Sequence, residues 1–325
     1  MVVSFIIPLY QAEKFIEQCL CSIMGNGLPE EDFEVLVIDD GSKDKGALIV
    51  EGLQKYHPNV KLFGQANSGA SAARNKGLEY AMGEWVWFVD ADDRVEENVL
   101  AKGKPLYGAL QDNATEMIAF NYVRDFDSHT APVINILNKE KMDGCDYLLR
   151  PKQGLYLWNH LFRRSSIGNH RFIDGTKNIE DFYFDIATII NMDQVLCLPI
   201  IGYHYDQRNM ESTSRCQSPE NLRKLSDDSQ TVYLHLLEDL KRLEGRKKDV
   251  VNCLLNYSVA GYVYSLFASY DSLSLHQGIG FLRRHGLYPV PKTNNRKANL
   301  FLLVANHEWL IGLMHKVPYL RKING

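Results

Sequence analysis

The sequence predicts an α/β protein with a mostly parallel sheet flanked by helices over residues 1–217, followed by a helical C-terminal extension over residues 218–325. Two observations indicate this fold class. Continuous apolar runs alternate with helical patterns through the first ninety residues, which is typical of a parallel sheet buried on both faces. From Pro219 onward, apolar residues recur at three- and four-residue spacing instead, which is typical of packed helices.

The first part of the chain alternates apolar strand-like runs with helical patterns. The expected strands are Val3–Ile7, Val35–Ile38, Val60–Phe63 and Trp85–Val89. The expected helices between them are Glu13–Met24, Ala47–Tyr56 and Ala70–Met82. A further helix is expected to begin near Val95, with Asp93 as its N-terminal cap. In such a sheet, ligands bind beyond the carboxyl ends of the strands.

The section from Lys102 to Asp206 has a mixed pattern. It contains strand-like segments at Met117–Val123 and Val195–Tyr205 and a helical pattern at Asp181–Asn191. A boundary is expected near residues 215–220, because the pattern becomes helical there. The helices expected beyond it are Leu222–Leu243, Val250–Tyr270 and Leu273–His285.

Composition and charge exclude several classes of protein. With 45% hydrophobic and 23% charged residues, the chain has the composition of a soluble globular protein, and its net charge of −4 does not indicate a nucleic-acid binder. The six cysteines are scattered without a C-x-x-C pair, which argues against a disulfide framework or a zinc site. No signal peptide is expected, because the first residues lack a basic segment and reach Pro8 early. No stretch offers the ~20 apolar residues of a membrane span, so a cytoplasmic, reduced protein is expected.

The C-terminal end is strongly basic. Between Arg283 and Gly325, eight Lys or Arg residues face a single acidic residue, Glu308. These basic residues are Arg283, Arg284, Lys292, Arg296, Lys297, Lys316, Arg321 and Lys322. A basic tail with aromatic residues suits peripheral contact of residues 283–325 with an anionic membrane surface, such as the inner face of the plasma membrane. A solvated helical face explains the charge equally well.

Polar clusters follow three of the expected strands. Asp39–Ser42 follows the second strand, Gln65–Gly69 the third and Asp90–Asp93 the fourth. The carboxyl ends of parallel strands meet at one edge of a sheet, so these clusters are expected to lie close together. Within the last cluster, Asp90 and Asp92 offer the hard oxygen ligands that suit Mg²⁺ or Mn²⁺.

A single D-x-D pattern is a weak signal, because short motifs recur by chance. The chain contains a second one, Asp125-Phe126-Asp127, which does not follow a comparable group of polar strand ends. The surroundings therefore favour Asp90 and Asp92 as the metal ligands over the second pattern.

Seven motifs occur in order between Ser4 and Tyr205. They are SFIIPLYQ at Ser4–Gln11, VIDDGSKD at Val37–Asp44, NSGASAARNKG at Asn67–Gly77, FVDADD at Phe88–Asp93, WNHLFRRS at Trp158–Ser165, IEDFYF at Ile179–Phe184 and GYHY at Gly202–Tyr205. Through these motifs, which cover about residues 1–215, the chain resembles the family 2 glycosyltransferases with the GT-A fold, a Rossmann-like, mostly parallel sheet. Two positions depart from the family: Gln11, where Asn is usual, and His160, where Lys is frequent.

The resemblance implies an inverting enzyme that uses a nucleotide-diphospho-sugar. Residues 1–100 would form the nucleotide-sugar half of the domain and residues 101–217 the acceptor half. In this family, Asp40 would accept a hydrogen bond from the uracil ring of UDP. The backbone from Pro8 to Tyr10 would lie beside the base, and Asn67 belongs to the same nucleotide-binding set. Arg74 would face the nucleotide or the diphosphate.

The resemblance also assigns the chemistry. Asp92 would bind the metal that bridges the donor's diphosphate, while Asp90 would reach the metal or the ribose. A divalent cation suits this position because the leaving UDP carries new negative charge. Asp181 would be the catalytic base, since a carboxylate away from the diphosphate must take the proton of the acceptor hydroxyl. Without the resemblance, Glu180 and Asp181 read equally well as an acidic helix N-terminus.

Other site candidates are weaker. Trp158 could stack on a sugar ring of the acceptor, although a core tryptophan is almost as common, and Glu180 could support the acceptor. His204 lies in a strand-like segment. Arg208 and the stretch Ser212–Ser214 follow it in a polar loop that could close over the diphosphate or lack a role.

Two other enzyme classes do not match the sequence. A sugar-nucleotide pyrophosphorylase needs a glycine- and arginine-rich loop after the first strand, where this chain has Pro8-Leu9-Tyr10-Gln11. A nicotinamide dehydrogenase needs G-x-G-x-x-G after a strand, which is missing. The sequence thus predicts a metal-dependent transferase that moves a sugar from UDP to a glycan or lipid-linked acceptor in polysaccharide assembly. The alternative is a non-catalytic relative that binds nucleotide sugars or glycans.

Overall fold

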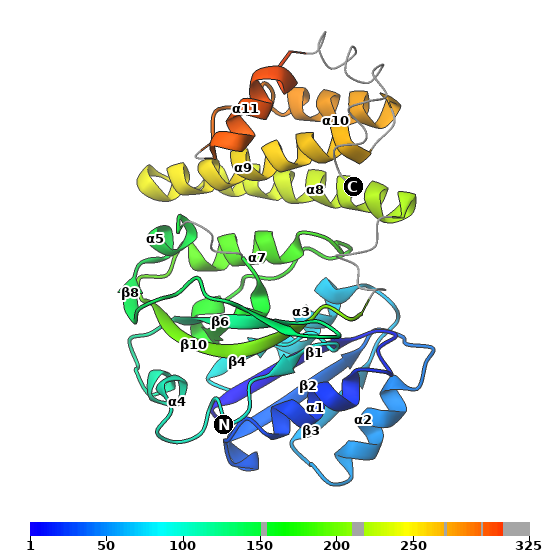
Figure 1. Ribbon diagram of the computed structural model, residues 1–325, viewed down its shortest axis with the longest axis vertical. Helices are drawn as coiled ribbons and strands as arrows, with labels where there is room; N and C mark the ends of the chain where they lie inside the picture. The colour runs from blue at the N-terminus through cyan, green and yellow to red at the C-terminus, as the bar shows by residue number, and fades with distance from the viewer. Residues whose placement is uncertain (151–154, 210–217, 270–271, 294, 308–325) are drawn as a thin grey trace. The chain divides into compact units, whose positions relative to one another are not determined.

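The computed structural model describes residues 1–150, 155–209, 218–269, 272–293 and 295–307 (Figure 1). The chain divides into two compact units, Met1–Cys216 and Gln217–Gly325. The first unit is an α/β domain and the second is helical, so the fold class predicted from the sequence is confirmed.

A curled sheet forms the centre of the first unit. In the described residues its strand order is β3-β2-β1-β4-β9-β6-β10-β5, with β7 beside β6 and β8 beside β10. The strands are β1 (Val3–Leu9), β2 (Phe33–Asp39), β3 (Val60–Gly64), β4 (Trp85–Phe88), β5 (Arg94–Val95), β6 (Met117–Asp125), β7 (Thr130–Val133), β8 (Glu140–Met142), β9 (His160–Arg163) and β10 (Val195–Asp206). Strands β1 to β4 are mutually parallel, and antiparallel β9 joins this half to the parallel pair of β6 and β10.

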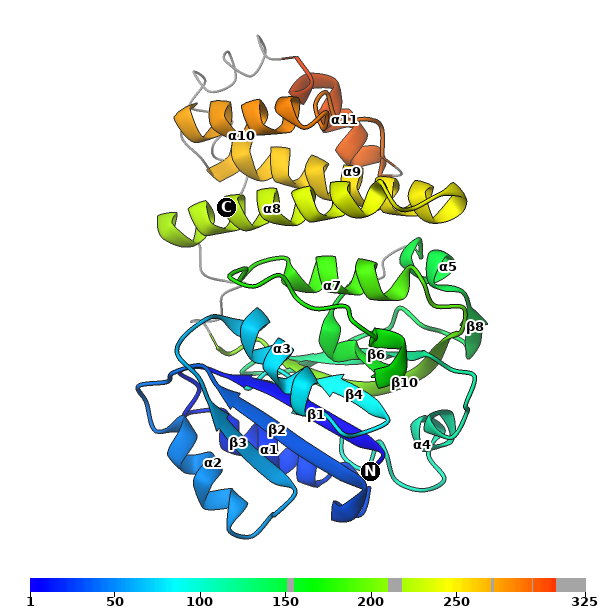
Figure 2. The same cartoon turned by 180° about the vertical axis from the view of Figure 1, so that it is seen from behind.

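Helices cover both faces of this sheet (Figures 1 and 2). They are α1 (Ile16–Met24), α2 (Gly46–Gln54), α3 (Ala70–Tyr80), α4 (Pro105–Leu110), α5 (Gly144–Leu148), α6 (Arg164–Ile167) and α7 (Glu180–Ile189). Short 3-10 turns lie at Glu30–Asp32 and Leu157–Asn159.

Alternation along β1 decides which helix lies on which face. Val3, Phe5 and Ile7 point into the core that includes the buried residues of α1. Ile6 points the opposite way, against Gly77 of α3, where an added Cβ would lie 2.3 Å from the Ile6 side chain. The glycine therefore lets α3 approach the sheet closely.

Helix α7 lies on the same face as α3. Phe88 of β4 is the register partner of Ile6, and its ring packs against Phe184 of α7 with centroids 5.6 Å apart. This arrangement brings the N-terminus of α7 next to α3, and both begin near the carboxyl ends of the parallel strands.

The strands and helices expected from the sequence occur within a few residues of their expected ends, with one error. No helix begins near Val95, and Asp93 is not a helix cap. Instead, Arg94 and Val95 form β5, which pairs with Tyr203 and His204 of β10. The buried carboxylate of Asp93 accepts hydrogen bonds from β10, so tertiary pairing determines the structure at this point.

The second unit contains α8 (Pro219–Leu240), α9 (Gly245–Ser269), α10 (Ser272–Arg284) and α11 (Arg296–Ala305). Helix α9 contacts the other three and buries a stripe of side chains at three- and four-residue spacing. That stripe consists of Val251, Leu255, Val259, Val263 and Leu266.

Part of helix α9 has the length and composition of a membrane-spanning helix. Its segment Gly245–Phe267 is long and apolar enough to cross a membrane, so the expectation that no segment could do so is wrong by that criterion. A buried core helix meets the same criterion, and α9 packs against three helices. The final part of the basic tail, residues 308–325, lies outside the described residues.

Candidate active site

The polar clusters predicted to meet at one edge of the sheet do so. Leu9 of β1 pairs with Asp39 of β2, which in turn pairs with Gly64 of β3, so these strands end side by side. The loop Asp90–Asp93 follows β4, the other neighbour of β1. At the end of β1, Pro8 is half-buried and Tyr10 is 50% exposed.

Asp40 organises the loop that precedes α3. Its buried carboxylate accepts hydrogen bonds from the backbone amides of Ser68 and Gly69, at 2.7 and 2.8 Å, and from the side chain of Gln65 at 2.9 Å. Asn67 is exposed within this loop. The carboxylate that the family resemblance assigns to uracil thus has a structural role as well, since it fixes the surface on which Asn67 lies.

Arg74 of α3 joins two motifs that are far apart in the sequence. Its guanidinium donates to Asp90 at 2.9 Å and to Glu180 at 2.8 Å. Burial opposes the charge of Arg74, but the two carboxylates outweigh it and hold its pKa above the ordinary value. The family resemblance predicted a cation that faces the nucleotide or the diphosphate, which no contact in the structure tests. The structure shows that this cation also connects the end of β4 to the start of α7.

The loop from Asp90 to Asp93 is held from β10. Tyr203 accepts a hydrogen bond from the Asp90 amide at 3.1 Å, and its hydroxyl donates to Asp93 at 2.9 Å. The Asp206 amide donates to the other Asp93 oxygen at 2.8 Å. Burial, followed by the charges of Asp92 and Asp90, raises the pKa of Asp93 well above its usual range. The carboxyl groups of Asp90, Asp92 and Asp93 therefore lie close together, and that of Asp93 is buried.

The two outer carboxylates determine whether a metal fits. Asp90 has a side chain that is 33% exposed, and Asp92 accepts a hydrogen bond from the Asn209 side chain at 2.7 Å. The described residues contain no group of three or more His, Cys, Asp or Glu side chains that could hold a metal alone. Mg²⁺ bound to a substrate diphosphate needs only one or two carboxylates, because phosphate and water oxygens complete its shell. Asp90 and Asp92 fit that requirement.

Asp181 lies in the first turn of α7. Ile179, the residue immediately before α7, has φ 52°, a left-handed conformation that is rare for a β-branched side chain. Burial, then the charges of Glu180 and Asp185, raise the pKa of Asp181 well above its usual range, against the opposing effect of Arg74. When deprotonated, this carboxylate has a higher proton affinity than an ordinary aspartate, which suits a base.

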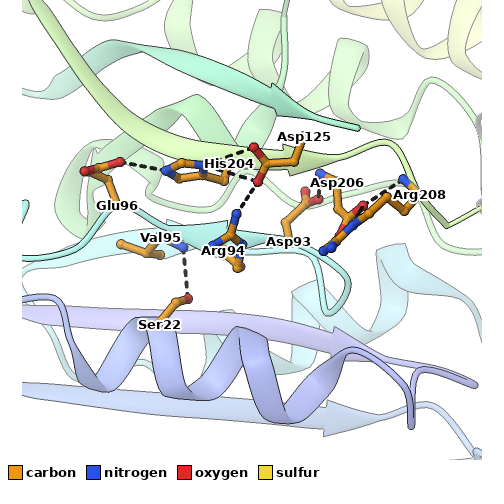
Figure 3. Close-up of polar contacts among 9 residues, drawn as sticks. All are labelled: Ser22, Asp93, Arg94, Val95, Glu96, Asp125, His204, Asp206 and Arg208. Carbon is orange, nitrogen blue, oxygen red and sulfur yellow. Dashed lines mark hydrogen bonds and ion pairs between the residues drawn. The ribbon is translucent and has the colours of Figure 1, made fainter. Parts of the chain in front are cut away.

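Two weaker candidates, Trp158 and Arg208, have packing or pairing roles. Trp158 is 6% exposed and stacks on Tyr203 and on Tyr156, which favours the second of its two interpretations, a core tryptophan. Arg208 forms an ion pair with Asp206 at the end of β10 (Figure 3). The stretch Ser212–Ser214 lies outside the described residues.

His204 lies between two carboxylates. Its Nε2 is 2.6 Å from Glu96 and its Nδ1 is 3.2 Å from Asp125, while Asp125 also pairs with Arg94 (Figure 3). His204 thereby fastens β10 to the segment after Asp90–Asp93. The second D-x-D pattern, which follows no comparable group of polar strand ends, is nevertheless connected to the first, because Asp125 contacts Arg94 and His204 in the strand pair that follows Asp90–Asp93.

Comparisons with known proteins identify the family of this chain. Residues 4–170 match the family described as Glycosyl transferase family 2. The chain belongs to this family. It is therefore a glycosyltransferase, and the family and fold inferred from the seven motifs are confirmed.

Individual relatives of this glycosyltransferase extend the match. EpsJ, an uncharacterized glycosyltransferase of Bacillus subtilis (strain 168), is 26% identical over 245 residues, which cover 72% of this chain and 70% of EpsJ. Residues 1–349 of TarS from S. aureus, solved with UDP-GlcNAc, superpose with a TM-score of 0.74 at 20% identity, covering 97% of this chain and 89% of that one. The mannosyltransferase PcManGT of Pyrobaculum calidifontis, solved with GDP-Man and Mn²⁺, gives a TM-score of 0.54 at 15% identity, covering 96% and 86%.

Sequence reasoning about this family 2 glycosyltransferase missed the supports of its site. Tyr203 and Asn209, which hold the Asp90–Asp93 loop, were not among the candidates. The only sequence signal for Tyr203 was its place in the GYHY motif, where alternation along a strand points it away from its neighbour His204.

Proposed function

We propose that this glycosyltransferase moves a sugar from a UDP-sugar to a hydroxyl group of a glycan or lipid-linked acceptor, with inversion at the anomeric carbon. One observation carries the proposal: Arg74 joins Asp90, at the donor side, to Glu180, beside Asp181. The carboxylate proposed to face the metal and the residue next to the proposed base are thereby held by one buried cation. TarS, which has a similar fold, was solved with UDP and with UDP-GlcNAc, and this supports UDP as the carrier.

The proposed reaction is a single displacement. The oxygen of the acceptor hydroxyl attacks the anomeric carbon from the face opposite the diphosphate, and its proton passes to a carboxylate oxygen of Asp181. A carbon–oxygen bond to the acceptor forms while the bond to the diphosphate breaks, and UDP leaves with that electron pair. Because attack and departure occur on opposite faces, the configuration inverts.

Residues at the strand ends would bind the donor. Asp90 and Asp92 would hold Mn²⁺ or Mg²⁺, which when bound supplies positive charge to the leaving diphosphate. PcManGT was solved with Mn²⁺, which supports a divalent cation in a protein of this fold. Pro8, Tyr10 and the loop that contains Asn67, ordered by Asp40, would receive the nucleoside.

The relatives also suggest a setting. TarS is named a poly(ribitol-phosphate) β-N-acetylglucosaminyltransferase, which supports a role in surface-polysaccharide or teichoic-acid-type synthesis. We place the reaction in the cytoplasm, at the inner face of the plasma membrane, with residues 283–325 as the peripheral contact. Co-sedimentation with anionic and neutral vesicles tests that contact. Salt-sensitive binding to anionic vesicles supports it, whereas equal binding to both kinds, or none, contradicts it.

A donor screen tests the function. The protein is incubated with UDP-GlcNAc, UDP-glucose, UDP-galactose and GDP-mannose in Mn²⁺, and the released nucleoside diphosphate is measured. We expect slow UDP release from at least one UDP-sugar, abolished by EDTA. Calorimetric binding of UDP without release from any donor would favour the non-catalytic alternative. Failure to bind UDP would contradict both.

A further inference from the structure

One face of the strand pair β6–β10 carries aromatic rings and a cation. In the register of this parallel pair, Tyr122 lies opposite Tyr203, and Arg124 lies opposite Tyr205. Side chains two residues apart on a strand point to the same face, so these four belong together. None of them is a carboxylate or an aliphatic residue, although β6 and β10 are otherwise rich in Ile, Val and Leu.

The rings form a stack that reaches from the core to the surface. Trp158 lies against Tyr203, with centroids 4.8 Å apart, and against Tyr156, with centroids 5.0 Å apart. Tyr205 packs on the same tryptophan at 5.3 Å. Tyr203 and Trp158 are buried, whereas Tyr156 and Tyr205 are only half-buried. The rings of Tyr156 and Tyr205 thus pack on the buried ring of Trp158 and remain partly accessible to solvent.

Arg124 brings an uncompensated positive charge to this stack. Its side chain is exposed, and its guanidinium contacts the Tyr122 hydroxyl at 3.5 Å. Within the residues that the structure describes, no carboxylate forms an ion pair with it, whereas Arg74 pairs with two carboxylates and Arg94 with one. The contact with Tyr122 raises the pKa of Arg124, so the group is cationic at every physiological pH.

The stack also lies within electrostatic reach of the proposed base. Burial raises the pKa of the Tyr156 phenol, and Asp181 raises it further, while Arg124 opposes the shift. The same phenol therefore senses both the carboxylate of Asp181 and the guanidinium of Arg124. The contacts place the stack beside the same site, because Tyr203, which stacks on Trp158, accepts from the Asp90 amide and donates to the Asp93 carboxylate.

We propose that Tyr156, Tyr205 and Arg124 form an acceptor subsite for a phosphorylated sugar or polyol. The apolar face of the sugar or polyol packs on the two half-buried rings, and its phosphate pairs with Arg124, whose planar fork matches phosphate oxygens. This inference rests on the proposed function, since it supplies the substrate class of the same site. The subsite predicts selection for anionic acceptors, because a neutral one leaves the guanidinium unpaired.

Calorimetry on the full chain with UDP and Mn²⁺ tests the subsite. The probes are glucose 6-phosphate with glucose, glycerol 3-phosphate with glycerol, and inorganic phosphate. We expect each phosphorylated probe to bind at least about tenfold more tightly than its neutral partner, and Arg124→Gln to remove that difference. Tyr156→Ala should weaken glucose 6-phosphate binding. Tyr156→Phe, which keeps the ring, should bind glucose 6-phosphate as the wild type does. Arg171→Gln is the matched control, because Arg171 is also exposed and donates only to backbone carbonyls in the contacts described.

Several results would overturn the subsite. These are equal binding of charged and neutral probes, no binding of either phosphorylated probe, and equal losses in Arg124→Gln and Arg171→Gln. Inorganic phosphate binding as tightly as glucose 6-phosphate would contradict the role of the rings. If glucose 6-phosphate discriminates and glycerol 3-phosphate does not, the subsite takes cyclic sugars; the reverse identifies polyol phosphates. UDP binding is recorded in the same titrations, so failure of the subsite with intact UDP binding is distinguished from failure of the proposed function.

Discussion

The hydroxyl of Tyr203 is bonded to the carboxylate of Asp93 at 2.9 Å, although 110 residues separate them in the sequence. The same oxygen accepts the amide of Asp90 at 3.1 Å, so a single buried phenol holds both ends of the Asp90–Asp93 turn. The carboxylates proposed to bind the metal therefore depend on a buried residue that is not itself one of the proposed ligands.

Tyr203→Phe should weaken metal-dependent UDP binding. The substitution leaves the Asp90 amide and one Asp93 oxygen unsatisfied in a buried place, which costs about 1–3 kcal/mol of folding free energy. We expect the free energy of unfolding to fall by that amount and the UDP affinity in Mn²⁺ to fall about tenfold. Tyr233→Phe is the control, because its hydroxyl bonds Ser258 in the helical unit and its loss should leave UDP affinity unchanged. Equal UDP affinity in wild type and Tyr203→Phe would refute the role.

Asp92→Asn should remove the strengthening of UDP binding by Mn²⁺, as measured by calorimetry with and without EDTA. The matched control is Asp127→Asn, at an exposed aspartate of the second D-x-D pattern. Asp125 is unsuitable as a control because it pairs with Arg94 and lies 3.2 Å from His204. Metal-dependent binding that persists in Asp92→Asn would exclude this carboxylate as a ligand.

Asp181→Asn should lower turnover by roughly 10²–10⁴-fold, the usual contribution of a positioned general base, with little effect on UDP binding. Because the base must be deprotonated and its pKa is raised, wild-type turnover should increase with pH through a limb above the usual aspartate range. Steady-state rates across pH, with Asp193→Asn as an exposed control, measure this. Glu180→Gln is no neutral control, since Glu180 is a buried partner of Arg74. A turnover near that of the wild type in Asp181→Asn would show that Asp181 is not the catalytic base.

The same substitution should stabilise the fold. A carboxyl group whose pKa is raised on folding contributes stability that is complete below the unfolded-state pKa and is lost as pH rises through the folded-state pKa. At neutral pH, the ionised Asp181 carboxylate therefore lowers the free energy of unfolding, because it is buried and lies near the charges of Glu180 and Asp185. Asp181→Asn should unfold at a higher temperature than wild type at neutral pH, and the gap should close in acid. An unchanged or lower melting temperature at neutral pH would contradict the charge argument.

Gln11→Asn should raise the free energy of unfolding by up to about 1 kcal/mol. Gln11 has φ 50°, and asparagine tolerates the left-handed region better than glutamine does. Gln18→Asn, on the exposed face of α1, is the opposite-sign control, because asparagine has the lower helix propensity there. Urea unfolding of both variants measures the pair, and a loss of stability in Gln11→Asn would be contrary to this reasoning.

The sequence was sufficient for the elements whose pattern is local. Buried parallel strands such as β1 and β2 are continuous apolar runs, and their carboxyl ends must meet, so the positions of Asp39 and Asp90 followed from the pattern. It failed at Asp93, because a two-residue strand has no periodicity and exists only through pairing with β10. Trp158 was ambiguous for a related reason: its burial depends on packing against Tyr203 of β10, which is far from it in the sequence.

Arg74 gives the site a spacing that loops alone could not maintain. Its two nitrogens belong to one planar group, and they hold Asp90, 16 residues away, and Glu180, 106 residues away. The separation of these carboxylates is therefore set by the dimensions of a guanidinium. Arg74→Lys would keep the charge, but a single ammonium on a flexible stem lacks that fixed width. In this molecule, an arginine fixes the distance between the end of β4 and the start of α7.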